Sequence, residues 1–190
     1  MQCPKQSDIS LADGQLPEGP KGYSCPECEG FWLSPERYTE WQAAVNPADS
    51  KPTIRILPST LEVAFSPSRL DNRAALCPNC KHYLARSRVA LKNTAFYVER
   101  CPNCWGMWCD RGEWQILQLL GFHTHLEALF SSDWQAHLRE LEQGERERQA
   151  TIEKLGEDLA KKVFDLADQL EHHPNGDYGV AYLMRRFDGE

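Results

Sequence analysis

Four cysteines in the middle of the chain have the spacing of a metal site. They form two pairs, each with two residues between its members, and twenty residues separate the pairs: Cys77, Cys80, Cys101 and Cys104. A two-residue gap lets one tight turn present two thiolates to one ion, and a hairpin of about twenty residues can return the chain to the same point. The frame predicts a four-thiolate zinc site, whose full coordination is typical of structural zinc.

Two stretches between the cysteine pairs can form the arms of this hairpin. Residues 84–91 and 94–100 are rich in Val, Leu, Phe and Tyr, and Lys92 and Asn93 lie near the turn. The alternative for paired cysteines is two disulfides, which persist in oxidising compartments. The chain opens with MQCPKQSDIS, which is not a basic start followed by an apolar run. We therefore expect a cytoplasmic protein and a bound metal.

The first 45 residues read as a degraded copy of the central four-cysteine segment, which is called the central ribbon below. Cys25 and Cys28 align with the second central pair, and Cys3 aligns with Cys77, at an offset of 74–76 residues. Gln6 occupies the place of the second thiolate. Such an offset indicates one duplication rather than a solenoid. The segment between the cysteines of this copy is poor in strand formers, and we expect it to meander.

The first copy offers zinc an incomplete ligand set. It contains three thiols: Cys3, Cys25 and Cys28. Three thiolates leave an open fourth position. One alternative is that this site has lost its metal and that the eighth cysteine, Cys109, is a small buried hydrophobe. In a second alternative Cys109 closes the first site, and in a third His123 or His125 does. One zinc is expected from the central site, and two if the first site is also filled.

Each second cysteine pair is followed by a glycine and, two residues later, by a tryptophan. These residues are Gly30 with Trp32, and Gly106 with Trp108. A glycine tolerates the positive φ that a metal-binding turn can require. The tryptophans could stack on nucleic-acid bases. We favour a core role over the metal site, because each tryptophan directly precedes a predicted helix.

Helices are predicted after both ribbons. One runs from Pro35 to about Val45 with Ser34 as its N-cap. The other runs from Arg111 to about Leu120, with Asp110 as the capping carboxylate. Between the two copies, residues 46–75 contain alternating apolar positions and a Pro58-Ser59 turn signal. They predict a short hairpin flanked by linkers.

The C-terminal third predicts a helical tail. A capping box that begins at Ser132 opens a long helix, and an apolar stripe recurs at helical spacing over residues 152–170. Gly144 lies in a stretch without apolar residues, where we expect the helix to be exposed or broken. A short final helix over residues 177–187 is expected to fold back and bury apolar side chains such as Val180, Tyr182 or Leu183.

The central segment resembles the TFIIB-type zinc-ribbon family of bacterial and plastid proteins. The resemblance is carried by the two CPNC pairs, by Gly106 and Trp108, and by the DRGE sequence at 110–113. It implies a zinc ribbon followed by a helix and an association with nucleic-acid binding, and it does not imply an enzyme. The family usually has Leu where this chain has Cys109. Residues 130–183 also resemble, more loosely, the tails of bacterial members.

We therefore predict a small α+β protein. Its expected parts are a degenerate ribbon plus helix at 1–45, a linker at 46–75, an intact ribbon plus helix at 76–121, and a helical tail at 122–190.

The charge distribution disfavours a strong non-specific nucleic-acid binder. The net charge is −7; residues 74–112 carry 6 basic and 2 acidic side chains, whereas residues 113–190 carry 8 and 16. Binding of that kind depends on a clear basic excess. We expect the small basic patch to face acidic parts of its own chain. Its candidate nucleic-acid-binding residues are Lys81, Arg86, Arg88, Lys92 and Arg100.

Three classes of function fit these features. The first is a non-catalytic interaction or assembly protein, whose acidic amphipathic tail binds a protein partner or a second copy. The second is a nucleic-acid-binding or transcription-associated ribbon. The third is a thiol-redox chaperone in which Arg111 activates Cys109. We favour the first and a non-enzymatic role, because no catalytic triad, phosphate loop or open His-rich metal site is visible. No apolar run approaches the about 20 residues of a membrane span.

Overall fold

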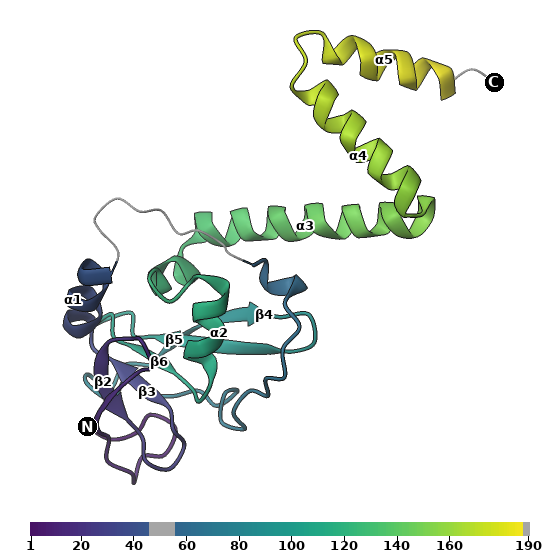
Figure 1. Ribbon diagram of the computed structural model, residues 1–190. Coiled ribbons are helices and arrows are strands. Elements are labelled where there is room, and N and C mark those ends of the chain that lie inside the picture. Colours follow the sequence, from purple (N-terminus) through teal and green to yellow (C-terminus); the bar gives the residue numbers. More distant parts are fainter. Residues whose placement is uncertain (46–55, 188–190) are drawn as a thin grey trace. The chain divides into compact units, whose positions relative to one another are not determined.

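The computed structural model describes residues 1–45 and 56–187 and divides the chain into two units, 1–138 and 139–190 (Figure 1). The strands are β1 (Ala12–Gln15), β2 (Lys21–Ser24), β3 (Phe31–Leu33), β4 (Ala85–Ala90), β5 (Ala95–Arg100) and β6 (Met107–Cys109). The helices are α1 (Pro35–Val45), α2 (Glu113–Leu120), α3 (Ser132–Leu155), α4 (Glu157–Glu171) and α5 (Gly176–Phe187). Two 3₁₀ turns, η1 (Pro58–Thr60) and η2 (Leu126–Phe130), complete the described elements. The predicted α+β class is confirmed.

One antiparallel sheet joins the two ribbon copies. Its strand order is β1-β2-β3-β6-β5-β4, so each copy supplies three strands and the copies meet where β3 pairs with β6. Trp32 lies opposite Trp108 in that pairing, with Phe31 opposite Cys109 and Leu33 opposite Met107. Because the two tryptophans are equivalent positions of the duplication, the copies are related by a local two-fold symmetry at the junction.

The glycine of each copy makes room for the tryptophan of the other. A Cβ atom at Gly30 would lie 2.1 Å from the Trp108 ring, and one at Gly106 would lie 2.2 Å from the Trp32 ring. Neither glycine has a positive φ, so the conformational reason expected from the sequence is wrong. The left-handed positions are instead the residues just before them, Glu29 and Trp105. Close approach is the physical requirement at these glycines.

Two apolar clusters make up the core of the first unit. One surrounds the cysteines and contains both junction tryptophans, which are 1% and 0% exposed. The core role predicted for Trp32 and Trp108 is therefore confirmed. The other cluster lies between the sheet and α2 and contains Trp114, Leu117 and Leu120. Phe122, Leu126 and Leu129, which the sequence grouped with the tail, are buried in it as well.

The hairpin predicted between the copies is not found in the described part of that segment. Ile54 lies outside the described residues, and residues 56–75 form η1 followed by chain that belongs to no strand. The carbonyls of Leu61 and Val63 accept hydrogen bonds from Lys92 and Asn93 at the tip of the β4–β5 hairpin. The alternating apolar residues therefore serve packing against the second ribbon rather than pairing with each other.

The first ribbon is more regular than its composition suggests. Instead of the expected meander, β1 and β2 pair over four residues, from Ala12–Ser24 to Gln15–Lys21. Strand β2 also pairs with β3 at Tyr23–Trp32 and Ser24–Phe31. The sheet supplies hydrogen bonds on both sides of β2, so tertiary pairing outweighs weak intrinsic preference. The β4–β5 hairpin, in contrast, forms as predicted.

The observed starts of α2 and α3 differ from two of the predicted helix caps. Ser34 accepts the Arg37 N–H at 3.4 Å, as expected for an N-cap. Helix α2 begins later than predicted, at Glu113, after Gly112 with φ 83°, and Asp110 uses its side chain elsewhere. The first turn of α3 is capped by Ser131, whose Oγ accepts the Trp134 N–H at 3.4 Å. The capping box placed at Ser132 is thus shifted by one residue.

The second unit exposes its apolar residues. The predicted stripe over 152–170 is divided at Gly156, whose φ of 76° ends α3 and separates it from α4. Helix α3 continues through Gly144, in agreement with an exposed helix there. In α5, Val180, Tyr182 and Leu183 are 49%, 54% and 37% exposed, so the predicted burial of this face is wrong. None of the described helices is long and apolar enough to cross a membrane.

Replacing Gly106 with Ala tests the junction. The new methyl group would overlap the Trp32 ring, and such overpacking should lower the free energy of unfolding by about 1–3 kcal/mol or more. The matched control is Gly144→Ala on the exposed face of α3, where nothing lies within 4 Å of the added atom. That change should raise helix stability by about 0.5–1 kcal/mol. Urea unfolding followed by circular dichroism measures both, and equal stability of the two variants would contradict the junction.

Candidate metal centres

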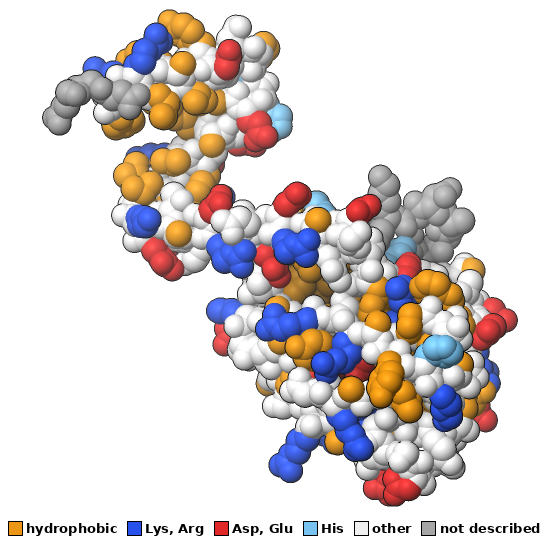
Figure 2. Space-filling model, turned by 180° about the vertical axis from the view of Figure 1, so that it is seen from behind, with side chains coloured by type: hydrophobic (Ala, Val, Ile, Leu, Met, Phe, Trp, Pro, Cys, Tyr) orange, Lys and Arg blue, Asp and Glu red, His pale blue; other side chains and the backbone are white. Residues whose placement is uncertain are grey.

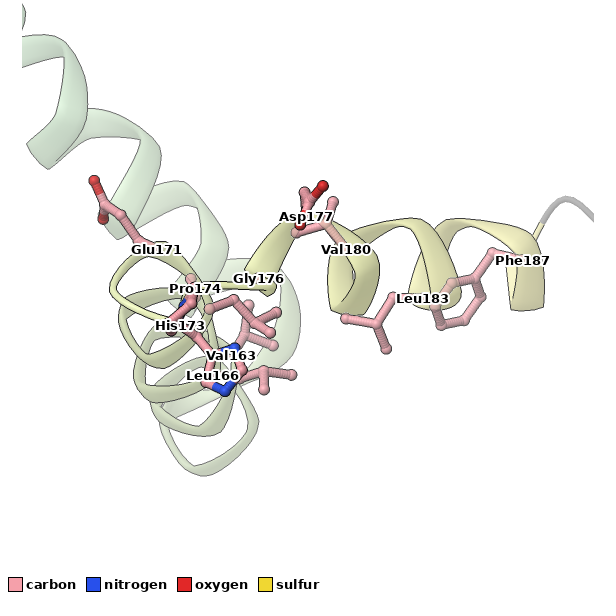
Figure 3. A pocket seen from close by; sticks show the side chains of 12 residues that line it. Val163, Leu166, Glu171, His173, Pro174, Gly176, Asp177, Val180, Leu183 and Phe187 are labelled. Atoms are coloured by element: carbon pink, nitrogen blue, oxygen red, sulfur yellow. The ribbon is translucent and has the colours of Figure 1, made fainter.

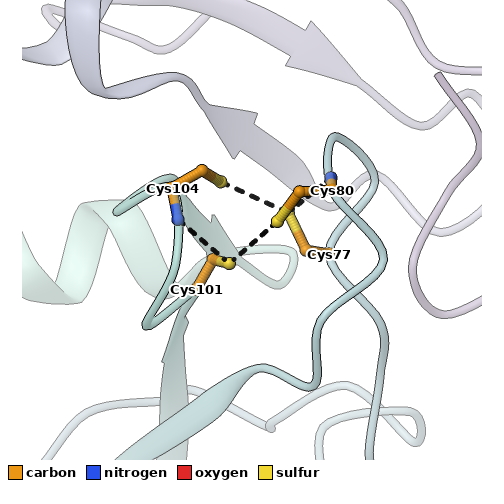
Figure 4. Close-up of side chains that lie close together, drawn as sticks. All are labelled: Cys77, Cys80, Cys101 and Cys104. Carbon is orange, nitrogen blue, oxygen red and sulfur yellow. Dashed lines mark hydrogen bonds between the residues drawn. The ribbon is translucent and has the colours of Figure 1, made fainter.

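The four central cysteines converge on one point at one end of the second ribbon (Figure 4). The Sγ atoms of Cys77 and Cys104 are 3.5 Å apart, and those of Cys80 and Cys101 are 3.3 Å apart. Disulfide sulfurs would be about 2.05 Å apart, whereas sulfurs around a tetrahedral zinc with bonds of about 2.3 Å are about 3.8 Å apart. The observed geometry therefore fits a metal cluster.

Each pair lies on a tight turn of the same construction. The Cys80 and Cys104 N–H groups point at the Cys77 and Cys101 sulfurs, both at 3.4 Å. The Cys77 carbonyl accepts a hydrogen bond from the Lys81 N–H, and the Cys101 carbonyl accepts one from the Trp105 N–H. Such amide–sulfur contacts stabilise thiolates, which is the form that binds metal.

The surroundings of these thiols shift their pKa values in opposite directions. A backbone hydrogen bond from His82 lowers the pKa of Cys80 to about 5. Burial instead raises the pKa of Cys77 and of Cys101. Zinc binding requires all four as thiolates and therefore releases protons from the buried members. The site would hold Zn²⁺ with four protein ligands and thus serve a structural role.

The first copy reproduces this cluster with three cysteines. Cys3, Cys25 and Cys28 offer sulfurs that all lie within 4.8 Å of one another, and the Cys3 and Cys28 sulfurs are 3.6 Å apart. The hydrogen bond with Cys28 lowers the pKa of Cys3, and the same bond raises the pKa of Cys28. A second zinc-type cluster is thus present in the degenerate ribbon, as its cysteine spacing indicated.

Cys109 does not join the first cluster. It lies in the apolar core between the sheet and α2, with Phe31 opposite it in the β3–β6 pairing, and is 1% exposed. Burial raises the pKa of its thiol well above the usual range. The closure hypothesis is therefore wrong, because pairing of the two ribbons turns Cys109 away from the three thiols. His123 and His125 are not part of that cluster either.

Lys5 connects the two ribbons at a position that sequence reasoning missed. It is 1% exposed, and its ammonium forms a buried ion pair with Glu99 of β5. It also donates to the carbonyl of Arg73 at 3.1 Å. Its place inside the first cysteine turn gave no sign of this, since a lysine in a turn is ordinarily solvated. One residue of the first ribbon thus neutralises a buried carboxylate of the second.

Buried acids surround this contact. Oxygens of Asp71, Asp110 and Glu113 lie within 4.8 Å of one another. Asp110 accepts the Trp108 indole N–H at 2.7 Å, and Glu113 accepts the Asp110 N–H at 2.8 Å. Burial raises the pKa of Glu113 well above its usual range and also raises that of Asp71. The D-R-G-E segment therefore fixes the junction tryptophan and the start of α2.

The predicted basic residues do not form one free patch. Lys92 pairs with Glu62 at 2.8 Å, and Arg100 is enclosed between the rings of Trp105 and Phe130, 4.8 and 4.5 Å from their centroids. Arg86 and Arg88 remain exposed on one face of β4, with Arg86 over the Tyr97 ring. Lys81 is exposed on the first turn of the central site. Figure 2 shows basic side chains spread over this unit among apolar and acidic ones.

Trp105 is a surface feature that the sequence analysis did not single out. It lies in the turn of the central site with φ 64° and is 57% exposed. Bulky residues rarely take a positive φ. Its position directly after the last cysteine of the turn, matched by Glu29 and Lys81 in the other turns, was the available signal.

Comparison with known families agrees with the central geometry. Residues 76–118 match the model of the TFIIB-type zinc ribbon, a family described as transcription factor zinc-finger. The match covers the four-cysteine site, its hairpin and most of α2, and it confirms the family identified for this segment. No curated protein and no solved structure gives a significant match to the chain.

Removing one central thiol tests the structural role of zinc. Cys101→Ser should unfold the second ribbon, because structural zinc contributes on the order of 10–16 kcal/mol in small zinc peptides and a whole domain is stable by only about 5–15 kcal/mol. Cys109→Ala is the matched control, which should keep its zinc because that thiol lies outside both clusters. Native mass spectrometry and thermal unfolding report the outcome. A Cys101→Ser protein that has lost the central ion but keeps the thermal stability of the intact protein would contradict the structural role of this site.

Proposed function

We propose that this protein is a non-catalytic zinc-ribbon interaction protein whose C-terminal helices bind an amphipathic helix of a protein partner. The observation that carries the proposal is that the apolar faces of the helices in the second unit are exposed. Within the described part of α4 and α5, only Ala160 and Gly176 are buried. Large apolar faces of this kind mark interaction sites in soluble proteins.

The exposed side chains form a groove between α4 and α5. It has a volume of about 860 Å³, with Val163 and Leu166 on one side and Val180, Leu183 and Phe187 on the other (Figure 3). Glycines bring the helices together at their connection. A Cβ atom at Gly176 would lie 1.8 Å from the Leu170 carbonyl oxygen. The helices are thus held at one end and leave an apolar cleft of a size that suits a helix.

The charge around the groove indicates which kind of helix would bind there. The acidic residues Glu171 and Asp177 line the groove, and none of its described lining residues is a lysine or an arginine. Residues 139–190 carry 8 basic and 13 acidic side chains. A partner helix with an apolar face and basic flanks complements this surface, whereas a second copy of the same acidic tail would bring like charges together.

The head contributes rigidity rather than chemistry. Its central zinc site is closed by four thiolates, and Cys109, the thiol considered for redox activity, is buried with a raised pKa. A protonated buried thiol is a poor nucleophile. These features support an assembly role in which the paired ribbons present the helical tail.

Peptide binding tests the groove. An 18-residue Leu/Lys helical peptide should bind the intact protein, and Val163→Asp/Leu183→Asp should weaken binding about tenfold or more, as expected for central apolar contacts. Both side chains are already partly exposed, at 41% and 37%, so the fold should persist. Gln149→Asp/Gln169→Asp is the charge-matched control. Fluorescence anisotropy measures affinity.

The same experiment separates other occupants. A Leu/Glu peptide of equal length should not bind, because its charge repels the acidic rim. Light scattering of the protein alone reports a homodimer, which would assign the groove to a second copy. Equal binding of the Leu/Lys peptide by the double variant and its control would overturn the groove as the site.

Nucleic-acid binding is the second candidate, and two observations favour it. The matched family is described as transcription factor zinc-finger. Arg86 and Arg88 lie exposed on β4 with Arg86 4.7 Å from the Tyr97 ring, a geometry that can contact phosphate beside a stacked base. The net charge of −7 opposes it.

Salt dependence tests this second candidate. Any binding to single-stranded RNA or DNA should be weak at physiological salt and should fall steeply as salt rises. Arg86→Glu/Arg88→Glu should abolish it, whereas Lys161→Glu/Lys162→Glu makes the same charge change on α4 and should leave it unaffected. A tight complex that survives physiological salt would place nucleic-acid binding above the groove proposal.

A further inference from the structure

We infer that the amide oxygen of Gln6 is the fourth ligand of the first metal site, and that this position is open to exchange with a small thiolate. The inference concerns the ribbon head and does not depend on the partner proposed for the tail. It rests on the match between the two cysteine clusters of the duplication and on a polar pocket beside the first of them.

The two clusters correspond atom by atom. Cys3 and Cys28 are 3.6 Å apart at sulfur, as Cys77 and Cys104 are at 3.5 Å. The remaining pair in the central site is Cys80 with Cys101, at 3.3 Å. In the first site the equivalent distance, 3.8 Å, joins the Cys25 sulfur to the Gln6 Oε1 atom. Gln6 thus places its amide oxygen where the central site has a thiolate.

The distance fits coordination as well as a hydrogen bond. With zinc–sulfur bonds of about 2.3 Å and zinc–oxygen bonds of about 2.0–2.2 Å, a sulfur and an oxygen on one tetrahedral ion lie about 3.6 Å apart. The observed distance of 3.8 Å between the Cys25 sulfur and the Gln6 Oε1 atom is close to that value. No other candidate competes within the described residues, because Cys109 and both predicted histidines lie outside the cluster.

An amide oxygen makes this site weaker than the central one. It is neutral and hard, whereas the ligand it replaces is anionic and soft, and zinc in a sulfur-rich site binds thiolate more strongly. The first site then carries three anionic ligands instead of four. Its metal should therefore exchange more readily, while the central metal stays in place.

A pocket gives a competing ligand access to this position. It has a volume of about 350 Å³, and its lining includes Gln6 and Cys28 together with the charged residues Glu27, Glu29, Arg69 and Arg111. Arg111 is paired with Glu29 at 3.1 Å, whereas Arg69 is exposed and forms no ion pair with any residue that the structure describes. A small thiolate fits this chemistry, since its sulfur can displace the amide oxygen and Arg69 offsets the negative charge that Glu27 adds to the lining.

Zinc competition tests the role of Gln6. The intact protein should hold two zinc ions in native mass spectrometry, one of which a chromophoric chelator removes first. Gln6→Cys should tighten that ion, and Gln6→Ala should loosen it, each on the order of 10–100-fold. The matched control is Gln2→Ala, which removes an exposed glutamine of the same segment and should change nothing.

Cobalt substitution tests the exchange. Adding β-mercaptoethanol to the cobalt-loaded protein should increase the sulfur-to-metal charge-transfer absorption, because one more thiolate binds. Gln6→Cys fills that position and should show no increase. The inference is overturned if Gln6→Ala holds its second zinc as tightly as the intact protein, if only Gln6→Cys holds two ions, or if the thiol leaves the spectrum unchanged. None of these outcomes depends on the tail.

Discussion

The structure of the first unit depends on the reciprocal packing of two tryptophans on two glycines. Trp32 and Trp108 face each other across the β3–β6 pairing, and each fills the space left by the missing side chain of the other copy's glycine. This contact merges two three-stranded ribbons into one sheet. Units as small as one ribbon bury little apolar surface, so the junction and the metal sites contribute much of the stability of this sheet.

Duplication allowed the two metal sites to diverge. The central site kept four thiolates, and its closed coordination suits a purely structural ion. The first site lost one thiolate to Gln6 and is now tied to the second ribbon by Lys5, whose ammonium pairs with the buried Glu99. Because the β3–β6 junction and the Lys5–Glu99 ion pair tie the first ribbon to the second, the first ribbon can keep its fold with a weaker metal site.

The helical tail, in contrast to the ribbons, gains little stability from internal packing. Its helices bury almost none of their apolar residues within the second unit, and helices of this length are only marginally stable in water without tertiary contacts. A partner helix in the α4–α5 groove would supply the missing contacts. A zinc-ribbon head and an incompletely packed tail are therefore both consistent with the interaction role proposed above.

Local spacing and periodicity were enough to predict the central metal site, the β4–β5 hairpin, the duplication and the helical tail. The remaining features depend on contacts between segments that are far apart in the chain. Pairing of β3 with β6 explains the glycines by close approach, sends Cys109 into the apolar core and makes β1–β2 a regular hairpin despite its composition. Gly156 ends α3 although the apolar stripe runs past it, since periodicity does not report a change of helix axis. Burial of Lys5 was equally hidden, because its ion-pair partner lies 94 residues away.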